Sequence, residues 1–338
     1  MYYYKWILTS LFVYQSAFAS INPDRVLNHL FFVNKEPSFE QGQLITEGIS
    51  VEPSKKHANR ATISKNRRMK VYVKEDFYQF VQDKAMSVFE IKNETSANTD
   101  SHGSGFLLDG NIVITNHHVI FSKYTQNGCH TTRLKVMAQE NDTSSIQYLS
   151  CKEVLYCDEL NDFCLVEFYP LKYRRQTYDL IDLFPKVQFD TTYLTTANPR
   201  IFVNSQGLID NQAELISINN SFGLGIQASS GYGFIVKKMH KEIQRECRQK
   251  KDKRRKRCLE RQRKKSITQL HHFAPVFQGA SGSPVFNREG SVVAITRAMT
   301  ADEQYGKHAV NYATPINVII DKLKADNQLK LVQLFENN

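Results

Sequence analysis

Beyond its first twenty residues the chain lacks any apolar run long enough to cross a bilayer as a helix. Within those residues, Lys5 precedes the short apolar run Trp6 to Val13, and the small residues of Ala17-Phe18-Ala19 follow. A basic residue, a short apolar run and a small-X-small pattern are typical of a secretory signal peptide. The alternatives are a buried helix or a membrane anchor. We expect residues 1–19 to be a signal peptide cut after Ala19, and the mature protein to be secreted or periplasmic.

Paired metal-ligand spacing is also missing from the sequence. Zinc ligands usually occur as cysteines or histidines about two to five residues apart. In this chain Cys151 and Cys157 are six residues apart, and Cys247 and Cys258 are eleven apart. The pair His117-His118 is adjacent rather than spaced along one helix face. The sequence therefore predicts no metal ion and no organic cofactor.

The six cysteines are instead compatible with disulfides, which persist in exported proteins. Cys129 is expected to pair with Cys151 or with Cys157, and the sequence does not choose between them. Cys164 lies inside the apolar stretch Phe163 to Phe168. We therefore interpret Cys164 as a buried free thiol.

Aromatic residues, glycine and proline are absent from Lys237 to Lys265, which holds sixteen basic and four acidic residues. Its net charge of +12 exceeds the +10 of the whole chain, so the remaining residues sum to −2. An apolar stripe recurs every fourth residue, at Ile235, Met239, Ile243 and Cys247. This stripe predicts a helical segment over residues 235–268. We expect the basic segment to bind an anionic polymer or a membrane surface, and the alternative is a solvated charged arm. Without aromatic residues it cannot stack on single-stranded bases, and no specific nucleic-acid motif is present.

Two cysteines lie within this basic segment. In one continuous helix Cys247 and Cys258 would be about 16 Å apart, far beyond the roughly 4.4–6.8 Å that a disulfide allows between Cα atoms. A chain reversal at Lys251-Asp252-Lys253 would bring them together. The sequence predicts a helical hairpin closed by a Cys247–Cys258 disulfide, against the alternative of one helix with free thiols.

The stretch Gln278-Gly279-Ala280-Ser281-Gly282-Ser283-Pro284 places a serine between glycines. A serine hydroxyl becomes an effective nucleophile when a base takes its proton and donors stabilise the oxyanion that develops. Glycine at position 279 permits a sharp turn that would aim the N–H groups of Gly279 and Ser281 at one carbonyl oxygen. These residues indicate a nucleophile with an oxyanion hole. The alternative is a surface turn that leads into a strand.

Two further stretches supply a base and an acid. Gly110 to Ile120 is an apolar strand that ends on the histidine pair, and Asn161 to Phe168 carries Asp162 into a second apolar strand. The block Gly103-Ser104-Gly105-Phe106 precedes the histidines, and the serine stretch comes last. In this order the four blocks resemble the trypsin-like (chymotrypsin-fold) serine proteases, in particular the bacterial secreted HtrA-type and glutamyl-endopeptidase-like branch. The resemblance covers roughly residues 78–330.

The resemblance implies a role for each residue. Ser281 would be the nucleophile, His118 the general base, and Asp162 the residue that orients the imidazole. The family pattern Thr-Asn-X-His selects His118 over its neighbour His117. Asp158 is the rival of Asp162, but it lies outside the apolar block. The function expected is that of a secreted serine endopeptidase, which hydrolyses protein or peptide substrates through an acyl-enzyme.

The resemblance also implies an all-β fold. We expect two antiparallel six-stranded β-barrels with the site between them, a closing helix over residues 316–327, and the inserted basic helical segment. The protease domain would span residues 78–330. Residues 20–77 would form an N-terminal extension or a propeptide, in which the basic stretch 54–68 is interpreted as an exposed linker.

Substrate preference is less well determined by the sequence. Alignment on the serine gives four expected substrate-binding residues, namely Pro275, Val276, Thr296 and Ala298. The last two would lie on an edge strand that binds substrate backbone by strand addition. No acid stands at the base of the pocket, so we expect medium apolar or small side chains rather than lysine or arginine. The pair His271-His272 is interpreted as a surface feature.

A second function class is also compatible with the sequence. A protease-like fold that is catalytically weak or inactive would serve as a binding module, with the basic segment as its binding surface. Such a module would often have lost a member of the triad, whereas His118, Asp162, Ser281 and Gly279 are all present here. The sequence therefore favours the enzyme.

Overall fold

The computed structural model describes residues 29–33, 38–40, 43–53, 61–94, 101–121, 128–137, 146–192, 213–223, 225–236, 268–272, 274–287, 289–301 and 309–336. The predicted signal peptide, most of the basic segment and its Cys247–Cys258 hairpin lie outside these residues, and so they stay predictions. Among the helices described, none is both long and apolar enough to cross a membrane.

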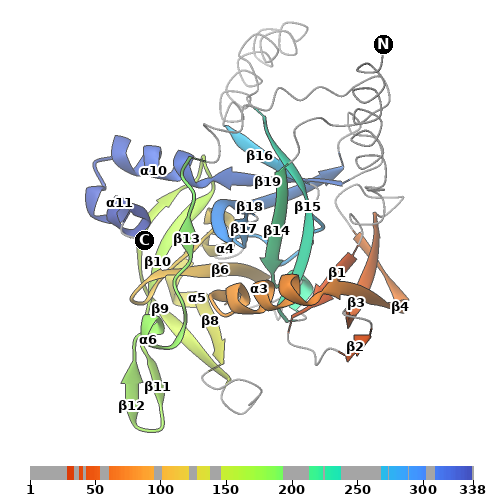
Figure 1. The fold of residues 1–338 in the computed structure, drawn as a ribbon. Helices are drawn as coiled ribbons and strands as arrows, with labels where there is room; N and C mark the ends of the chain where they lie inside the picture. Colours follow the sequence, from red (N-terminus) through yellow and green to blue (C-terminus); the bar gives the residue numbers. More distant parts are fainter. Residues whose placement is uncertain are drawn as a thin grey trace, which may run out of the picture.

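Six antiparallel strands close into a barrel (Figure 1). They pair in the order β10-β7-β6-β5-β8-β9 and have the bounds β5 Val88–Asn93, β6 Ser101–Asp109, β7 Ile112–Thr115, β8 Thr132–Met137, β9 Ile146–Asp158 and β10 Phe163–Phe168. Successive side chains of a strand point to opposite faces. In β10, Cys164 and Val166 therefore join the barrel interior, whereas Phe163 and Leu165 join a second cluster outside it. The first predicted barrel is confirmed.

The second lobe is built on an eleven-stranded sheet. Six of its strands have the bounds β14 Ala213–Asn219, β15 Gln227–Val236, β16 Gln269–His272, β17 Pro284–Phe286, β18 Ser291–Ala301 and β19 Ala309–Pro315. They pair in the order β14-β17-β18-β19-β16-β15, and β14 also pairs with β15, so the pairing returns to its first strand. Ile235 and Val236 are strand residues paired with β16. The predicted start of the basic helix at residue 235 is therefore wrong.

The N-terminal strands extend this sheet beyond β15. They are β1 His29–Phe32, β2 Ser38–Glu40, β3 Gln43–Pro53 and β4 Ala61–Lys74, and β1 pairs with β15 through Phe31↔Ala228. The interpretation of residues 54–68 as a linker is wrong for residues 61–68, which pair with β3 as part of β4. The basic side chains misled the interpretation, because lysine and arginine are also typical of the outermost strand of a sheet.

A hydrophobic core joins the two lobes. It includes Phe106, Phe163 and Leu165 from the outside of the barrel, and Ile216 and Phe286 from the second lobe, all at most 2% exposed. Burying a large apolar side chain contributes about 1.5–3 kcal/mol. The boundary between the lobes is therefore a packed interior that fixes one lobe against the other.

The longer helices also pack on this core. They include α3 (Glu75–Ala85) and α10 (Ile316–Ala325), and α10 lies close to the predicted closing helix at 316–327. A further helix, α11 (Leu329–Glu336), follows a turn at Asn327, which adopts a positive φ of 57°. Its Phe335 packs against Phe189 of β13 (Gln188–Phe189), with ring centroids 5.0 Å apart. Figure 1 shows α10 and α11 side by side next to the barrel.

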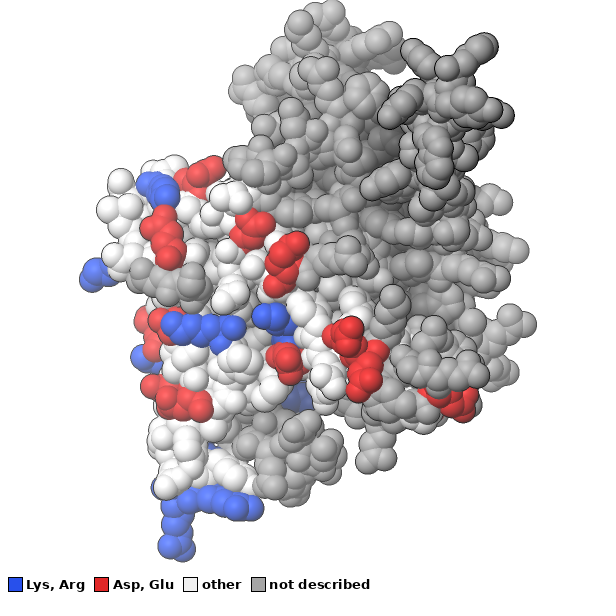
Figure 2. Space-filling view, in the orientation of Figure 1, with Lys and Arg blue, Asp and Glu red and all other residues white. Residues whose placement is uncertain are grey.

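Shorter elements complete the described structure. They are α4 His117–Ile120, α5 Gly128–Thr131, the hairpin β11 Leu171–Tyr173 with β12 Gln176–Tyr178, α6 Leu180–Leu183 and the 3₁₀ turn η2 Ser221–Gly223. On the face shown in Figure 2, acidic and basic side chains are interspersed over the described residues, with a basic group at the projecting end where Figure 1 places β11 and β12. That hairpin exposes Lys172, Arg174 and Arg175.

Two disulfides link elements of the barrel. Cys129 of α5 pairs with Cys151 of β9, which decides between the two partners left open by the sequence. Cys164 pairs with Cys157, its direct neighbour across β9 and β10. The interpretation of Cys164 as a free thiol is therefore wrong. Its apolar surroundings suit a disulfide equally well, because a disulfide carries no charge and no strong hydrogen-bonding group.

Candidate active site

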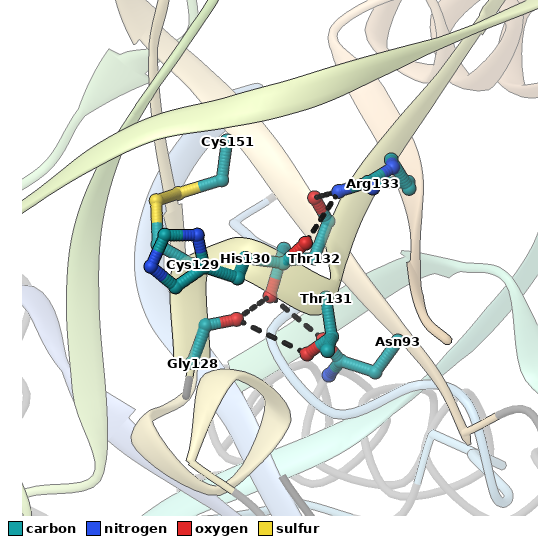
Figure 3. Close-up of a disulfide and its surroundings, with 8 residues drawn as sticks. All are labelled: Asn93, Gly128, Cys129, His130, Thr131, Thr132, Arg133 and Cys151. Carbon is teal, nitrogen blue, oxygen red and sulfur yellow. Dashed lines mark hydrogen bonds between the residues drawn. A yellow bond between two sulfur atoms is a disulfide. The ribbon is translucent and has the colours of Figure 1, made fainter. Parts of the chain in front are cut away.

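His118 is presented by the end of strand β7. The strand continues through Asn116 into the one-turn helix α4, whose residues Val119 and Ile120 are buried in the barrel interior. The Asn93 amide donates a hydrogen bond to the carbonyl of Val119, and Thr132 Oγ1 donates to Asn93 Oδ1 (2.7 Å). Figure 3 shows the contact between Thr132 and Asn93 beside the Cys129–Cys151 disulfide. The backbone that carries His118 is therefore anchored to the barrel core on one side, while its side chain stays 48% exposed.

The neighbouring histidine lies differently. His117 and His118 both belong to the short helix α4. The His117 ring stacks on Phe121 with centroids 5.0 Å apart. Only His118, of these two, contacts Asp162.

Asp162 is held in an uncommon backbone conformation between β9 and β10. Its φ is +57°, a left-handed value that aspartate tolerates better than most residues. The Asn116 amide donates to the carbonyl of Asp162 (2.7 Å). The carboxylate accepts two hydrogen bonds from His118, from the backbone N–H to Oδ1 (3.0 Å) and from Nδ1 to Oδ2 (2.8 Å). This double contact fixes the imidazole against the carboxylate.

Asp158, the rival acid, has a different place. Its carboxylate accepts from the N–H of Asn161 (2.5 Å) and lies 3.6 Å from Nζ of Lys322. Asp158 thus shapes the turn that presents Asp162, and it makes no contact with either histidine among the described residues.

The serine loop belongs to the second lobe, yet the first lobe holds it. Ser104 of β6 donates its N–H to the carbonyl of Ser281 (2.7 Å) and its Oγ to the carbonyl of Gly279 (2.8 Å). Ser104 Oγ also accepts from the N–H of Asn220 (3.0 Å). Gly282 has φ of +90°, and a Cβ at this position would collide with Ser104 O and Thr115 Oγ1. Glycine is therefore required by both conformation and space.

Two N–H groups of the loop remain available. Those of Ala280, Gly282 and Ser283 donate to the carbonyls of Phe277, Thr296 and Ala280 respectively. Within the described residues, the N–H groups of Gly279 and Ser281 have no acceptor. Gly279 has φ of +98°. These two N–H groups are the ones that the sequence predicts to form an oxyanion hole.

The segments that carry His118 and Ser281 meet at Gly103, and Asp162 joins them through its hydrogen bonds with His118. A Cβ at Gly103 would lie 3.3 Å from the carbonyl oxygen of Ser281 and collide with the side chain of Val119, the residue after His118. Because Gly103 has no side chain, the helix with His118 and the loop with Ser281 can both approach it closely. The structure therefore brings His118, Asp162 and Ser281 to one region at the boundary of the lobes.

The segment before the serine loop is clamped by buried side chains. Asn311 Nδ2 donates to the carbonyl of Ala274 (2.6 Å), and Ser229 Oγ donates to that of Pro275 (2.7 Å). The N–H of Phe277 donates to Ser221 Oγ (3.1 Å). The sequence gives no signal for these side chains, because they are small polar residues scattered over three elements.

The four expected substrate-binding residues lie on two segments. Pro275 and Val276 are buried behind the serine loop. Thr296 of β18 is also buried, and both its backbone groups bond the loop, through its N–H to Ser283 (2.8 Å) and its carbonyl to Gly282 (2.9 Å). Ala298 is exposed. Beyond Thr296, β18 pairs with β19 alone among the described strands.

The histidine pair His271-His272 is not on the surface, so that interpretation is wrong. β16 lies between β15 and β19, and the two residues are 4% and 0% exposed. The His271 ring meets Tyr312 edge to face, with centroids 4.5 Å apart. Burial, reinforced by the neighbouring His271, lowers the pKa of His272 to about 3. His272 is therefore a neutral interior residue.

Comparison with known proteins agrees with this geometry. A family model described as a trypsin-like peptidase domain matches residues 103–295, which include His118, Asp162 and Ser281. The chain belongs to the trypsin-like peptidase family. It is accordingly a serine protease, a hydrolase whose substrates are proteins or peptides.

Other comparisons add less for this trypsin-like peptidase. No curated protein matches the chain. Among solved structures, a chain described as the crystal structure of Deg5 aligns with a TM-score of 0.47 and 16% identity, covering 73% of this chain and 91% of that chain. Within the described residues no group of three or more histidine, cysteine or acidic side chains could hold a metal ion.

Proposed function

We propose that this trypsin-like peptidase is an exported serine endopeptidase in which His118, Asp162 and Ser281 form the catalytic triad. The observation that carries the proposal is the double hydrogen bond from His118 to the carboxylate of Asp162. A carboxylate on Nδ1 keeps the proton on that nitrogen and leaves the lone pair of Nε2 free. This is the tautomer that a general base requires.

The reaction follows from these roles. His118 Nε2 takes the proton of Ser281 Oγ while Oγ attacks the carbonyl carbon of the scissile bond. The resulting imidazolium is stabilised by Asp162. It then gives its proton to the amine that leaves as the C–N bond breaks, and an acyl-enzyme remains. Water, deprotonated by the same imidazole, attacks the ester, and the proton returns to Ser281 Oγ as the acid product leaves.

The oxyanion hole consists of the N–H groups of Gly279 and Ser281. In support, these two donors have no acceptor within the described part of the loop, while the N–H groups between and after them are engaged. Ser104 holds the carbonyls of the same two residues, and so it fixes the peptide plane that follows each of the two donors. Preorganised donors of this kind typically contribute about a hundredfold to a thousandfold each in rate.

Labelling with a fluorophosphonate probe tests the triad in the full chain. The natural protein should react, and Ser281→Ala should not react at all. His118→Ala and Asp162→Asn should slow labelling by several orders of magnitude, because members of a triad act as a unit. His117→Ala is the matched control and should change the rate less than about threefold, an expectation based on its separate packing against Phe121. A folded natural protein that stays unlabelled, or a loss confined to His117→Ala, would reject the assignment.

Export is part of the proposal, and the cysteine chemistry of the barrel is compatible with it. Two disulfides are compatible with an oxidising compartment, and residues 1–19 have the pattern of a signal peptide. Sequencing the N-terminus of the mature protein should give Ser20 as its first residue. It would also show whether residues 20–77 are removed as a propeptide.

A second activity is supported by the charge of the basic segment, Lys237 to Lys265. With a net charge of +12 in a chain of +10, this segment is proposed to bind an anionic polymer or membrane surface. Ser281→Ala protein should sediment with vesicles containing phosphatidylglycerol and not with neutral ones. Replacing residues 253–257 by glutamine should abolish this binding, whereas glutamine at the exposed Lys172, Arg174 and Arg175 of the β11–β12 hairpin should not.

If the basic segment alone were functional, the protein would be a binding module. That outcome would appear as vesicle binding by a folded natural protein that fails to react with the fluorophosphonate probe. The intact set of triad residues argues for the enzyme.

A further inference from the structure

A guanidinium shares the carboxylate that His118 uses. Arg297 Nε lies 3.3 Å from Asp162 Oδ2, the same oxygen that lies 2.8 Å from His118 Nδ1. The Asp162 side chain is 9% exposed and that of Arg297 is 24% exposed. One largely buried anion therefore faces a permanent cation and a histidine that becomes a cation during catalysis.

Arg297 is held in place by the serine loop. It lies on β18 at the irregularity in register between Thr296 and Ala298. Thr296, immediately before it, is bonded through both backbone groups to Gly282 and Ser283. The side chain of Arg297 then crosses from the second lobe to the turn of the first lobe that carries Asp162. Its charge is thus fixed relative to both Ser281 and Asp162.

The other charged groups near this turn belong to several elements and are engaged elsewhere. The ion pairs and hydrogen bonds of the region connect Asp158 and Tyr156 of β9 with Lys322 of α10 and with Asp326, which follows that helix. His117 of α4 stacks on Phe121, and Glu159 on the turn itself is exposed. Among the described residues, Arg297 and His118 alone form ion pairs with Asp162.

We propose that Arg297 is a positioning residue that acts through Asp162. Its guanidinium holds the Oδ2 oxygen that accepts from His118 Nδ1, and it places a fixed positive charge beside the base. The inference rests on the triad proposed above. When His118 takes up a proton it gains attraction from Asp162, but it also meets the charge of Arg297 on the same oxygen, and the second effect offsets part of the first.

Coulomb's law sets the size of this effect. Two like unit charges that share one partly exposed carboxylate oxygen displace a protonation midpoint by roughly half a pH unit to one unit. Salt screens charges that water can reach, so the displacement should shrink as ionic strength rises.

The test compares Arg297→Gln with Arg297→Lys. His118 protonation is followed by NMR of the imidazole in the Ser281→Ala chain, and kcat/KM is measured against pH in the chain with Ser281. Arg297→Gln should raise the midpoint of His118 protonation and the acid limb of kcat/KM by roughly 0.5–1 pH unit. Arg297→Lys, which keeps the charge, should stay within about 0.3 unit of the parent.

Arg133→Gln is the matched control. Arg133 is 25% exposed and pairs with Glu94 at 3.5 Å, against 24% and 3.3 Å for Arg297. It lies on β8, outside the region where the three catalytic segments meet, and its removal should leave both midpoints unchanged.

Several outcomes would overturn the proposal. If the midpoint of His118 protonation stays or falls in Arg297→Gln, or rises equally in Arg297→Lys, then the charge of Arg297 does not act on His118. A lower kcat or a higher KM without a shift of the acid limb assigns Arg297 a structural or substrate-contact role instead. If Arg297→Gln fails to fold, Arg297→Met, which also removes the charge, takes its place in the same two titrations. The NMR titration needs no catalysis, so an inactive protein would reject the proposed function without deciding this inference.

Discussion

Removing the Cys157–Cys164 disulfide tests how the acid of the site is held. The bond joins directly opposite residues of β9 and β10, and the turn between them contains Asp162 in its left-handed conformation. We predict that the double variant Cys157→Ala/Cys164→Ala loses more activity than stability. Without the bond, the ends of the turn can separate, and Asp162 leaves the geometry in which it accepts both hydrogen bonds from His118.

The loop lengths give the expected loss of stability. In the chain-entropy model, a disulfide that closes a loop of about eight residues contributes about 2.5 kcal/mol, and one that closes about 23 residues contributes about 3.4 kcal/mol. The sequence separations are 7 for Cys157–Cys164 and 22 for Cys129–Cys151. The second bond should therefore contribute more to stability, although it lies farther along the chain from Asp162.

Cys129→Ala/Cys151→Ala is accordingly the matched control. Thermal unfolding ranks the two double variants in stability, and the rate of fluorophosphonate labelling at a temperature where both are folded ranks them in activity. The control should be the less stable of the two, and the Cys157→Ala/Cys164→Ala variant should be labelled at least about tenfold more slowly than the control, as expected for a misplaced catalytic group. Equal labelling rates, or a slower rate in the control, would show that the disulfide does not position Asp162.

Three further changes have predictable results. Gly282→Ala should lower the free energy of unfolding by more than about 3 kcal/mol, because the new Cβ meets Ser104 O and Thr115 Oγ1. Gly110→Ala is the control, because a Cβ there meets open space, and it should lower that free energy by about 1 kcal/mol. Chemical denaturation measures both. Ser104→Ala should lower kcat more than it raises KM, since Ser104 Oγ holds the carbonyl of Gly279. Burial lowers the pKa of His272 in the folded protein to about 3, whereas its value in the unfolded chain is near 6.5. Between these two pH values the unfolded chain therefore binds a proton that the folded protein does not. Stability should therefore fall as the pH falls, by about 2 kcal/mol between pH 6.5 and 5 from this group, and His272→Phe should reduce that slope.

Each of these has an outcome that would contradict it. A Gly282→Ala protein as stable as Gly110→Ala would mean that the loop has room for a side chain. An equal rise in KM and fall in kcat for Ser104→Ala would assign the hydroxyl to substrate binding rather than to the oxyanion loop. A denaturation free energy with the same pH slope in His272→Phe and the natural protein would mean that His272 is protonated in the folded state.

The local motifs were predictable because each is short and chemically restricted. The left-handed turn at Gly282 needs glycine, and the strand that enters α4 and the strand that follows Asp162 are runs of apolar residues. These constraints act within a few residues, so the sequence shows them. The first barrel and the closing helix were expectations from the resemblance to the trypsin-like proteases, which these motifs carry.

Features that depend on contact partners were not predictable. The burial of His271 and His272 is decided by the strands on either side of β16, and polar residues gave no sign of it. The disulfide of Cys164 depends on the register between β9 and β10. The basic character of residues 61–68 suits either an exposed linker or an edge strand, and only the pairing with β3 distinguishes them.

The catalytic arrangement depends most on contacts that are distant in sequence. Ser104 and the carbonyl of Gly279 are 175 residues apart in the chain, and Thr314 Oγ1 donates to the carbonyl of Asn161 across 153 residues (2.7 Å). The ion pair of Arg297 with Asp162 crosses the same boundary between the lobes. In the proposed triad the acid and base come from one lobe and the nucleophile from the other. The geometry of the site therefore depends on the core between the lobes. Destabilising that core, for example with Phe286→Ala, should therefore reduce the labelling rate of Ser281 before the protein unfolds globally, because the two halves of the site separate along the boundary that the core closes.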